Sequence, residues 1–139
     1  MIKDDCIFCK IANGNIPSYS LYEDNDFKVI LDIEPSSLGH ALIIPKNHAA
    51  NIFELDDEIL SKSLIIAKKV GNSIKSVLKC SGMNILQNNG ETAGQTILHY
   101  HIHLIPRYDN DSVVLSWKKS SLDKNEAISF AKSVQERII

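Results

Sequence analysis

The stretch "HYHIHLIPRY", residues 99–108, carries three of the chain's five histidines at alternate positions. In a β-strand, side chains two positions apart point to the same face and lie roughly 6.8 Å from each other. His99, His101 and His103 would therefore share one face, with apolar side chains on the other. Imidazole changes its protonation near neutral pH, so this row indicates nucleophilic or acid–base chemistry. The plainer alternative is a half-buried strand whose polar face is histidine by chance.

A single metal ion cannot account for all three imidazoles. His99 and His103 would lie roughly 13 Å apart on an extended strand, whereas a zinc–nitrogen bond is only about 2.1 Å long. The three side chains must then have different roles. One can bind a metal, its neighbour can act as a nucleophile, and the third can donate a hydrogen bond to an anion.

Four ordered blocks of the sequence resemble one protein family. "HYHIHLI" is similar to the His-φ-His-φ-His-φ-φ signature, φ being apolar, of the histidine triad (HIT) superfamily of nucleotide hydrolases and transferases. "NNGETAGQT" resembles the glycine-containing phosphate loop of that family. Upstream, the opening blocks of the Hint-like branch resemble "DCIFCKIANGNIPS", "FKVILDIEP" and "GHALIIPKNH". The resemblance covers residues 5–108, and Asn88 favours the Hint-like branch because the Fhit-like branch carries Gln there.

The resemblance implies a nucleotide hydrolase. Such an enzyme would cleave nucleoside phosphoramidates or dinucleoside polyphosphates at the α-phosphate and release an AMP-like product from a purine nucleotide. His101 would attack phosphorus to form a nucleotidyl-histidine that water hydrolyses. His103 would donate to the phosphate or the leaving group, and His40 would support His99 beside the triad. Two rivals stay open: a nucleotide-binding regulatory module with negligible turnover, and a nucleotidyltransferase with an acceptor other than water.

The same resemblance assigns residues that bind substrate. Asp32 would accept hydrogen bonds from the ribose hydroxyls, and it ends an apolar strand, where an unpaired carboxylate is unexpected. Gln95 would either contact the phosphate or brace the loop backbone. The resemblance implies that the further donors around the phosphate would be Asn88, Gly94 and Thr96. The apolar slot for the base would consist of Ile7, Phe8, Ile11, Ile30 and Ile33, with ordinary core packing as the alternative.

A second site is indicated by "CIFC", because Cys6 and Cys9 have a spacing that lets two thiolates bind one tetrahedral ion. A redox role would need a thioredoxin-like βαβ setting, which the neighbouring "KIANGNIPS" does not offer. The resemblance implies that His48 and His99 complete the ligand set. Four protein ligands would leave no open position, so the expected cofactor is a structural zinc.

Composition limits the class of protein. With 139 residues, 44% of them hydrophobic, the chain has apolar surface for one core. Lys and Arg number 15 against 17 Asp and Glu, so no basic surface for nucleic acid is expected. The charged start "MIKDDC" and the absence of a long apolar run argue against secretion and membrane insertion. Three cysteines, with Cys80 expected as an inert buried thiol, suit a reducing compartment, so a cytoplasmic protein is expected.

The hydrophobic pattern predicts an α+β protein, and the family resemblance implies the HIT-like fold. Alternating or apolar runs in "SYSLYED", "NDFKVILDI", "HALIIPKNH", "MNILQNN" and the histidine segment predict an antiparallel sheet of about five strands. Three-and-four spacing predicts a long helix from Asp56 to about Lys79, stopped by Gly82, and a second helix from Leu122 onward. We expect one HIT domain over residues 1–139, with residues 108–139 as a C-terminal extension in which Trp117 either closes over the pocket or packs the helix. The resemblance also implies a homodimer.

Overall fold

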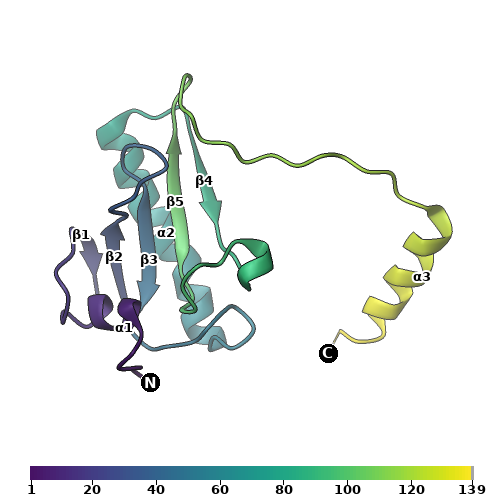
Figure 1. Ribbon diagram of the computed structural model, residues 1–139, viewed down its shortest axis with the longest axis horizontal. Coiled ribbons are helices and arrows are strands. Elements are labelled where there is room, and N and C mark those ends of the chain that lie inside the picture. Colours follow the sequence, from purple (N-terminus) through teal and green to yellow (C-terminus); the bar gives the residue numbers. More distant parts are fainter. Residues whose placement is uncertain (139) are drawn as a thin grey trace.

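The computed structural model describes residues 1–138 and contains a five-stranded antiparallel sheet in the order β1-β2-β3-β5-β4 (Figure 1). The strands are β1 Ser20–Glu23, β2 Phe27–Leu31, β3 Ala41–Pro45, β4 Gly82–Leu86 and β5 Ile102–Arg107. Four of the strands lie within segments that the hydrophobic pattern predicts, and β4 begins at Gly82, one residue before its predicted segment. The expected α+β class with an antiparallel five-stranded sheet is confirmed.

One long helix, α2 Asp57–Leu78, covers one face of the sheet (Figure 1). Its N-terminus is capped by Asp56, whose carboxylate accepts a hydrogen bond from the backbone N–H of Glu58 at 2.9 Å. The helix ends at Leu78 and is followed by Lys79, which adopts a left-handed conformation (φ 55°). The prediction that Gly82 stops the helix is wrong, because Gly82 is already the first residue of β4.

Strand β3 is buried over its whole length, as its apolar run predicts. Ala41 and Ile43 pack into the main core with α2, whereas Leu42 and Ile44 face a second, smaller cluster. That second cluster includes side chains of α1 Ile7–Ala12, a helix of six residues that the sequence pattern did not predict. The sheet is therefore covered by α2 on one face and by α1 on part of the other.

The C-terminal region departs from the rest of the chain. Beyond Asp111 the backbone runs as an extended arm over residues 112–123 and ends in α3 Lys124–Gln135 (Figure 1). The predicted second helix is thus confirmed, but none of its described side chains is buried. Among the described residues, no helix is long and apolar enough to cross a membrane.

Candidate active site and metal centre

The triad histidines lie where β5 begins. The strand starts at Ile102, so His99 and His101 belong to the segment that leads into it, and the expectation of one strand carrying all three is corrected. The alternation nevertheless continues through this segment. The intervening side chains pack into the main core, as expected: Tyr100, Ile102 and Leu104. The ring centroids of His101 and His103 lie 4.9 Å apart, so the two imidazoles are neighbours.

The tautomer of His101 follows from its hydrogen bond. Nδ1 of His101 lies 2.7 Å from the carbonyl oxygen of His99, and a carbonyl can only accept, so the proton is on Nδ1. The lone pair on Nε2 is then free. Burial lowers the pKa of His101, and the ring edge of Phe8 packs against it with centroids 5.0 Å apart. The geometry provides a neutral imidazole with an available nitrogen nucleophile.

A second chain of hydrogen bonds orients His103. The backbone N–H of Ser36 donates to Nδ1 of His40 at 3.0 Å, so the proton of a neutral His40 is on Nε2. That Nε2–H donates to Nδ1 of His103 at 2.9 Å, which leaves His103 with its proton on Nε2. Asp32 Oδ2 lies 3.7 Å from the same His40 nitrogen. Burial lowers the pKa of His40, and burial together with the neighbouring histidines lowers the pKa of His103 to about 4.

The expected role of His40 as a support for His99 is wrong. The register between β3 and β5 pairs Ala41 with Leu104, which places His40 at the His103 end of the triad segment. His99 lies at the other end of that segment, and its Nε2 forms a hydrogen bond with the carbonyl oxygen of Pro45 in β3.

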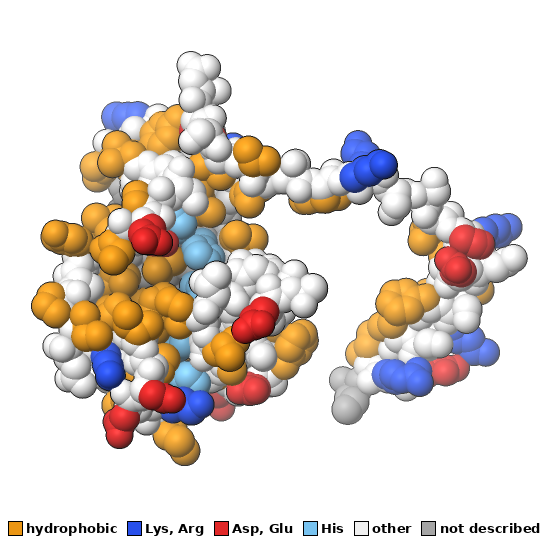
Figure 2. Space-filling view, in the orientation of Figure 1, with side chains coloured by type: hydrophobic (Ala, Val, Ile, Leu, Met, Phe, Trp, Pro, Cys, Tyr) orange, Lys and Arg blue, Asp and Glu red, His pale blue; other side chains and the backbone are white. Residues whose placement is uncertain are grey.

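A cavity of about 590 Å³ opens beside the triad. Its lining includes the residues that were expected to bind ribose and phosphate, together with two of the histidines: Asp32, Asn88, Gly94, Thr96, His40 and His103. In Figure 2 histidine side chains lie at the centre of the body, bordered by hydrophobic side chains. The wall also includes residues 112–115, the first part of the C-terminal arm, which the sequence reasoning did not assign to the site. A more apolar groove of about 420 Å³ between α2 and β1 contains none of the histidines.

The phosphate loop is held by its own side chains. Gly94 has a φ of 93°, a conformation that favours glycine, and its carbonyl accepts from Asn88 Nδ2 at 3.4 Å. Gln95 is buried and accepts from the backbone N–H of Gly90 at 2.8 Å. Its amide donates to the carbonyls of Ala50 at 2.6 Å and Ile97 at 3.1 Å. This geometry favours the bracing alternative for Gln95.

The residues expected to hold the base differ in their surroundings. Phe8 and Ile30 are buried, and Ile11 packs against them in the cluster under α1. Ile7 is exposed, and Ile33 is 83% exposed next to the cavity residue Asp32. Ile7 and Ile33 are thus accessible to a ligand, whereas Phe8 and Ile30 also serve as ordinary core.

The second cluster brings together Cys6, Cys9, His48 and His99, from segments up to 93 positions apart. Cys6 Sγ lies 3.4 Å from His99 Nδ1, and Cys9 Sγ lies 3.5 Å from the Nδ1 atoms of both histidines. The two Nδ1 atoms are 3.2 Å apart. Tetrahedral zinc bonds would place two nitrogens about 3.3 Å apart and a nitrogen and a sulfur about 3.6 Å apart. The observed separations agree with this geometry.

The orientation of His99 also suits a metal. Its Nε2 lies 2.8 Å from the carbonyl oxygen of Pro45 and must donate to it, so the Nδ1 lone pair points at the cluster. Burial lowers the pKa of His99 to about 4, so that nitrogen is unprotonated near neutral pH. Thiols, lone pairs and spacing all fit a four-coordinate zinc.

The chain is similar to known proteins over most of its length. Residues 13–110 match the HIT domain model. The chain belongs to the HIT family. The adenosine 5′-monophosphoramidase HNT1 of Saccharomyces cerevisiae is 42% identical over 119 residues, which are 85% of this chain and 73% of that protein.

Two solved structures extend the similarity of this HIT protein. A HIT-family member from Bacillus subtilis superposes with a TM-score of 0.91 at 37% identity and covers 98% of this chain and 99% of that one. A zinc-bound histidine triad family protein from Mycobacterium smegmatis superposes with a TM-score of 0.74 at 31% identity, covering 96% and 98% of the two chains. The expected HIT-like fold is thereby confirmed.

Proposed function

We propose that this HIT protein hydrolyses nucleoside phosphoramidates or dinucleoside polyphosphates at the α-phosphate, through a covalent bond between phosphorus and His101. The observation that carries the proposal is the hydrogen bond from Nδ1 of His101 to the carbonyl of His99, which leaves Nε2 free as a nucleophile. The activity named for the Saccharomyces cerevisiae relative supports a substrate that contains AMP.

In the first step, Nε2 of His101 forms a bond to phosphorus while the bond to the leaving group breaks. The leaving group departs with the bonding electrons and takes up a proton. The imidazole becomes cationic, and its Nδ1–H still donates to the carbonyl of His99 at 2.7 Å, which stabilises the positive charge. Water then displaces His101 from phosphorus and releases the nucleoside monophosphate.

The other residues of the cavity stabilise charge and hold the substrate. His103 presents its Nε2–H as a donor to an oxygen of the phosphate or to the leaving group, because its Nδ1 is occupied by His40. Asp32 lines the same cavity and is the proposed acceptor for the ribose hydroxyls. Asn88, Gly94 and Thr96 are the proposed donors to the remaining phosphate oxygens. Phe8 and the isoleucines of the apolar slot, Ile7, Ile11 and Ile33, are proposed to contact a purine base.

We also propose that Cys6, Cys9, His48 and His99 hold a structural zinc. Such an ion would cross-link α1, the segment after β3 and the segment before β5. His99 would then be fixed from both sides, by the metal at Nδ1 and by Pro45 at Nε2. Its carbonyl, which orients His101, would be fixed with it.

The covalent step can be tested by mixing the protein with adenosine phosphoramidate that is radiolabelled in the α-phosphate. The reaction is then stopped rapidly without acid. We expect protein-bound label to form before product in the wild type and to be lost on acid treatment. His101→Ala should show neither label nor turnover, whereas Tyr19→Ala, an exposed site, should behave like the wild type. Normal turnover without any label on the ring would exclude the mechanism.

The same experiment addresses the two rivals. A binding module would bind AMP, as measured by calorimetry, but it would hydrolyse neither adenosine phosphoramidate nor diadenosine tetraphosphate. A transferase would form the labelled intermediate and transfer the label to an added amine or alcohol faster than to water. Hydrolysis as the main outcome would support the proposal.

A further inference from the structure

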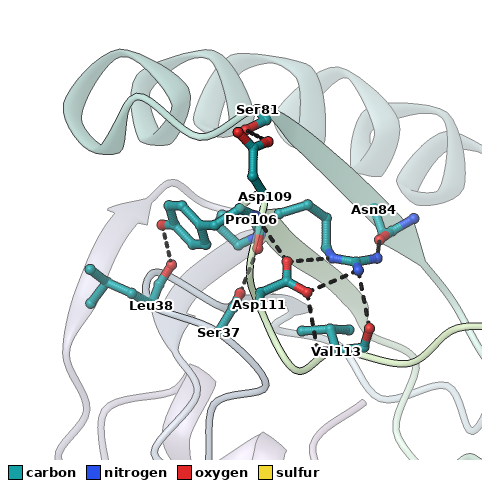
Figure 3. Close-up of polar contacts among 10 residues, drawn as sticks. Ser37, Leu38, Ser81, Asn84, Pro106, Asp109, Asp111 and Val113 are labelled. Atoms are coloured by element: carbon teal, nitrogen blue, oxygen red, sulfur yellow. Dashed lines mark hydrogen bonds and ion pairs between the residues drawn. The ribbon is translucent and has the colours of Figure 1, made fainter.

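The segment that carries the nucleophile lies outside the hydrogen-bond ladder of the sheet. On β5 the register with β3 begins at the pair of Ile102 and Ile43, so residues 99–101 precede the ladder. The C-terminal end of β5 is also held by a side chain, because Ser37 donates to the carbonyl of Pro106 at 2.6 Å (Figure 3). The position of residues 99–101 must therefore depend on contacts other than strand pairing.

Tyr100 makes two such contacts, one with its backbone and one with its side chain. Its N–H donates to the carbonyl of Ala49 at 2.7 Å. Its ring is buried in the main core, and its hydroxyl lies 3.0 Å from Oγ of Ser63 on α2. Ser63 donates its single hydroxyl proton to the carbonyl of Leu60 at 2.7 Å, so the hydroxyl of Tyr100 is the donor in the pair. Tyr100 is thus anchored to the long helix.

The pair of hydroxyls is a specific connection and not a consequence of packing. The side chains of Ser63 and Tyr100 are both buried, and a polar group without a partner in such a place costs free energy. The family signature has an apolar residue at position 100, where phenylalanine would fill the core with the same ring. The hydroxyl of Tyr100 therefore adds something that the signature does not require.

The peptide unit between His99 and Tyr100 connects this anchor with the nucleophile. Its C=O accepts from Nδ1–H of His101 at 2.7 Å, and its N–H donates to the carbonyl of Ala49. Because a peptide unit is planar, a rotation that moves one of these groups also moves the other. The hydrogen bonds form one chain from the imidazole through the peptide to Ala49. Bonds in such a chain polarise one another, which strengthens the acceptor that faces His101.

We propose that Tyr100 is a positioning residue, whose hydrogen bond to Ser63 holds the peptide between His99 and Tyr100 in the orientation that His101 needs. The inference rests on the proposed function, in which the carbonyl of His99 stabilises the positive charge that forms on His101 during attack. That charge develops in the transition state and is absent when substrate binds. Loss of the anchor should therefore lower kcat and leave KM unchanged.

A double variant separates this positioning role from a role in folding. Ser63→Ala alone leaves the buried hydroxyl of Tyr100 without a partner, so it should be less stable than the wild type. Ser63→Ala with Tyr100→Phe removes both hydroxyls, and urea unfolding should find it about as stable as the wild type. Its kcat for adenosine phosphoramidate should nevertheless fall about fivefold, because the anchor is one hydrogen bond. Wild-type kcat in this stable double variant overturns the proposal.

Ser73→Ala is the matched control on the same helix. The hydroxyl of Ser73 also lies near a backbone carbonyl, that of Lys69 at 3.4 Å, but Ser73 is exposed and contacts no part of the catalytic segment. We expect Ser73→Ala to keep the kcat, KM and stability of the wild type. A loss of kcat in this control equal to that in the double variant would mean that the anchor has no specific effect.

Proton NMR of the imidazole follows the hydrogen bond of His101 without any turnover. In protein labelled with ¹⁵N-histidine, the signal of His101 is the one that disappears in His101→Ala. We expect its Nδ1–H proton to lie far downfield in the wild type and in Ser73→Ala. In the double variant it should shift upfield and exchange faster with water, because the carbonyl of His99 is less well placed.

The two measurements distinguish failure of this inference from failure of the proposed function. An unchanged Nδ1–H signal in the double variant overturns the inference, whatever the rates of hydrolysis are. A shifted signal in a protein that hydrolyses no nucleotide would support the anchoring of His101 and contradict the proposed function.

Discussion

Nε2 of His40 lies 2.9 Å from Nδ1 of His103, and the backbone N–H of Ser36 occupies the other nitrogen of His40. Because a backbone N–H can only donate, the direction of each hydrogen bond is fixed: Ser36 donates to His40, and His40 donates to His103, which lines the cavity. A protonated His40 would set its Nδ1–H against that same N–H. The arrangement consequently favours a neutral His40 and a His103 that presents its Nε2–H to a ligand.

This relationship predicts that His40 acts as a positioning residue. Leucine at position 40 removes the donor and frees His103 to adopt the other tautomer. We expect His40→Leu to lower kcat about fivefold, with a smaller effect on KM, because one hydrogen bond contributes about 1 kcal/mol. Steady-state kinetics with adenosine phosphoramidate would measure both constants.

Glutamine is the matched control at the same position. Its side-chain amide can donate to Nδ1 of His103 and accept from the backbone N–H of Ser36. We expect His40→Gln to recover most of the kcat that His40→Leu loses. Equal losses in the two variants would mean that the hydrogen bond to His103 does not control the tautomer.

The lowered pKa of His103 predicts how stability depends on pH. An unfolded histidine has a pKa of about 6.5, whereas burial and the neighbouring histidines lower the pKa of His103 to about 4 in the folded chain. Between these values the unfolded chain binds more protons, so the free energy of unfolding must fall as pH decreases from about 6.5 to about 4. This histidine contributes no pH dependence above that range.

Urea unfolding of the wild type and of His103→Gln at pH 7 and pH 4.5 would measure the effect. We expect the wild type to lose on the order of 2 kcal/mol more than the variant between the two pH values. Contributions from groups that do not contact His103 cancel in this comparison. Equal losses of the free energy of unfolding in the two proteins would show that folding does not lower the pKa of His103.

Much of the fold follows from local pattern. Alternating or apolar runs predicted all five strands, and the three-and-four spacing predicted α2 to within one residue at each end. Helix α1 was missed because six residues are too few to show a helical period. The spacing of Cys6 and Cys9 indicated a metal site, but Cys6 and His99 are 93 positions apart, so the histidine ligands followed from the family resemblance.

The site differs from the sequence interpretation where long-range geometry decides. His40 reaches His103 and not His99 because the β3–β5 register places it there, and register is not visible in a single strand. Residues 112–115 line the cavity just beyond the turn in which Arg107 donates to Asp111. Neither relationship has a local signal in the sequence.

The proposed zinc predicts different effects for two buried cysteines. Cys9→Ser removes a ligand and should reduce the zinc content from one ion per chain to a small fraction. The free energy of unfolding should fall by several kcal/mol, since metal binding adds to folding. Cys80, which is also buried but lies outside the cluster, is the control, and Cys80→Ser should keep its zinc.

Elemental analysis and thermal unfolding with and without EDTA would measure both quantities. EDTA should lower the Tm of the wild type and of Cys80→Ser, and it should leave the Tm of Cys9→Ser nearly unchanged. A wild-type protein that is free of zinc and insensitive to EDTA would be inconsistent with the structural site.

Gly39 offers a test of the packing that positions His40. Its φ is 88°, and a Cβ at this position would collide with Leu78 of α2 and press on Pro106 of β5 at 3.3 Å. We expect Gly39→Ala to lower the free energy of unfolding by about 2–3 kcal/mol, because backbone strain and overpacking both contribute.

Gly14→Ala is the control: its φ is 83°, but no atom lies within 4 Å of the added Cβ, so strain alone should cost about 1 kcal/mol. Because His40 follows Gly39 directly, Gly39→Ala should also lower kcat, whereas Gly14→Ala should not. Equal stability of the two variants in urea unfolding would mean that α2 and β5 move apart without cost at this contact.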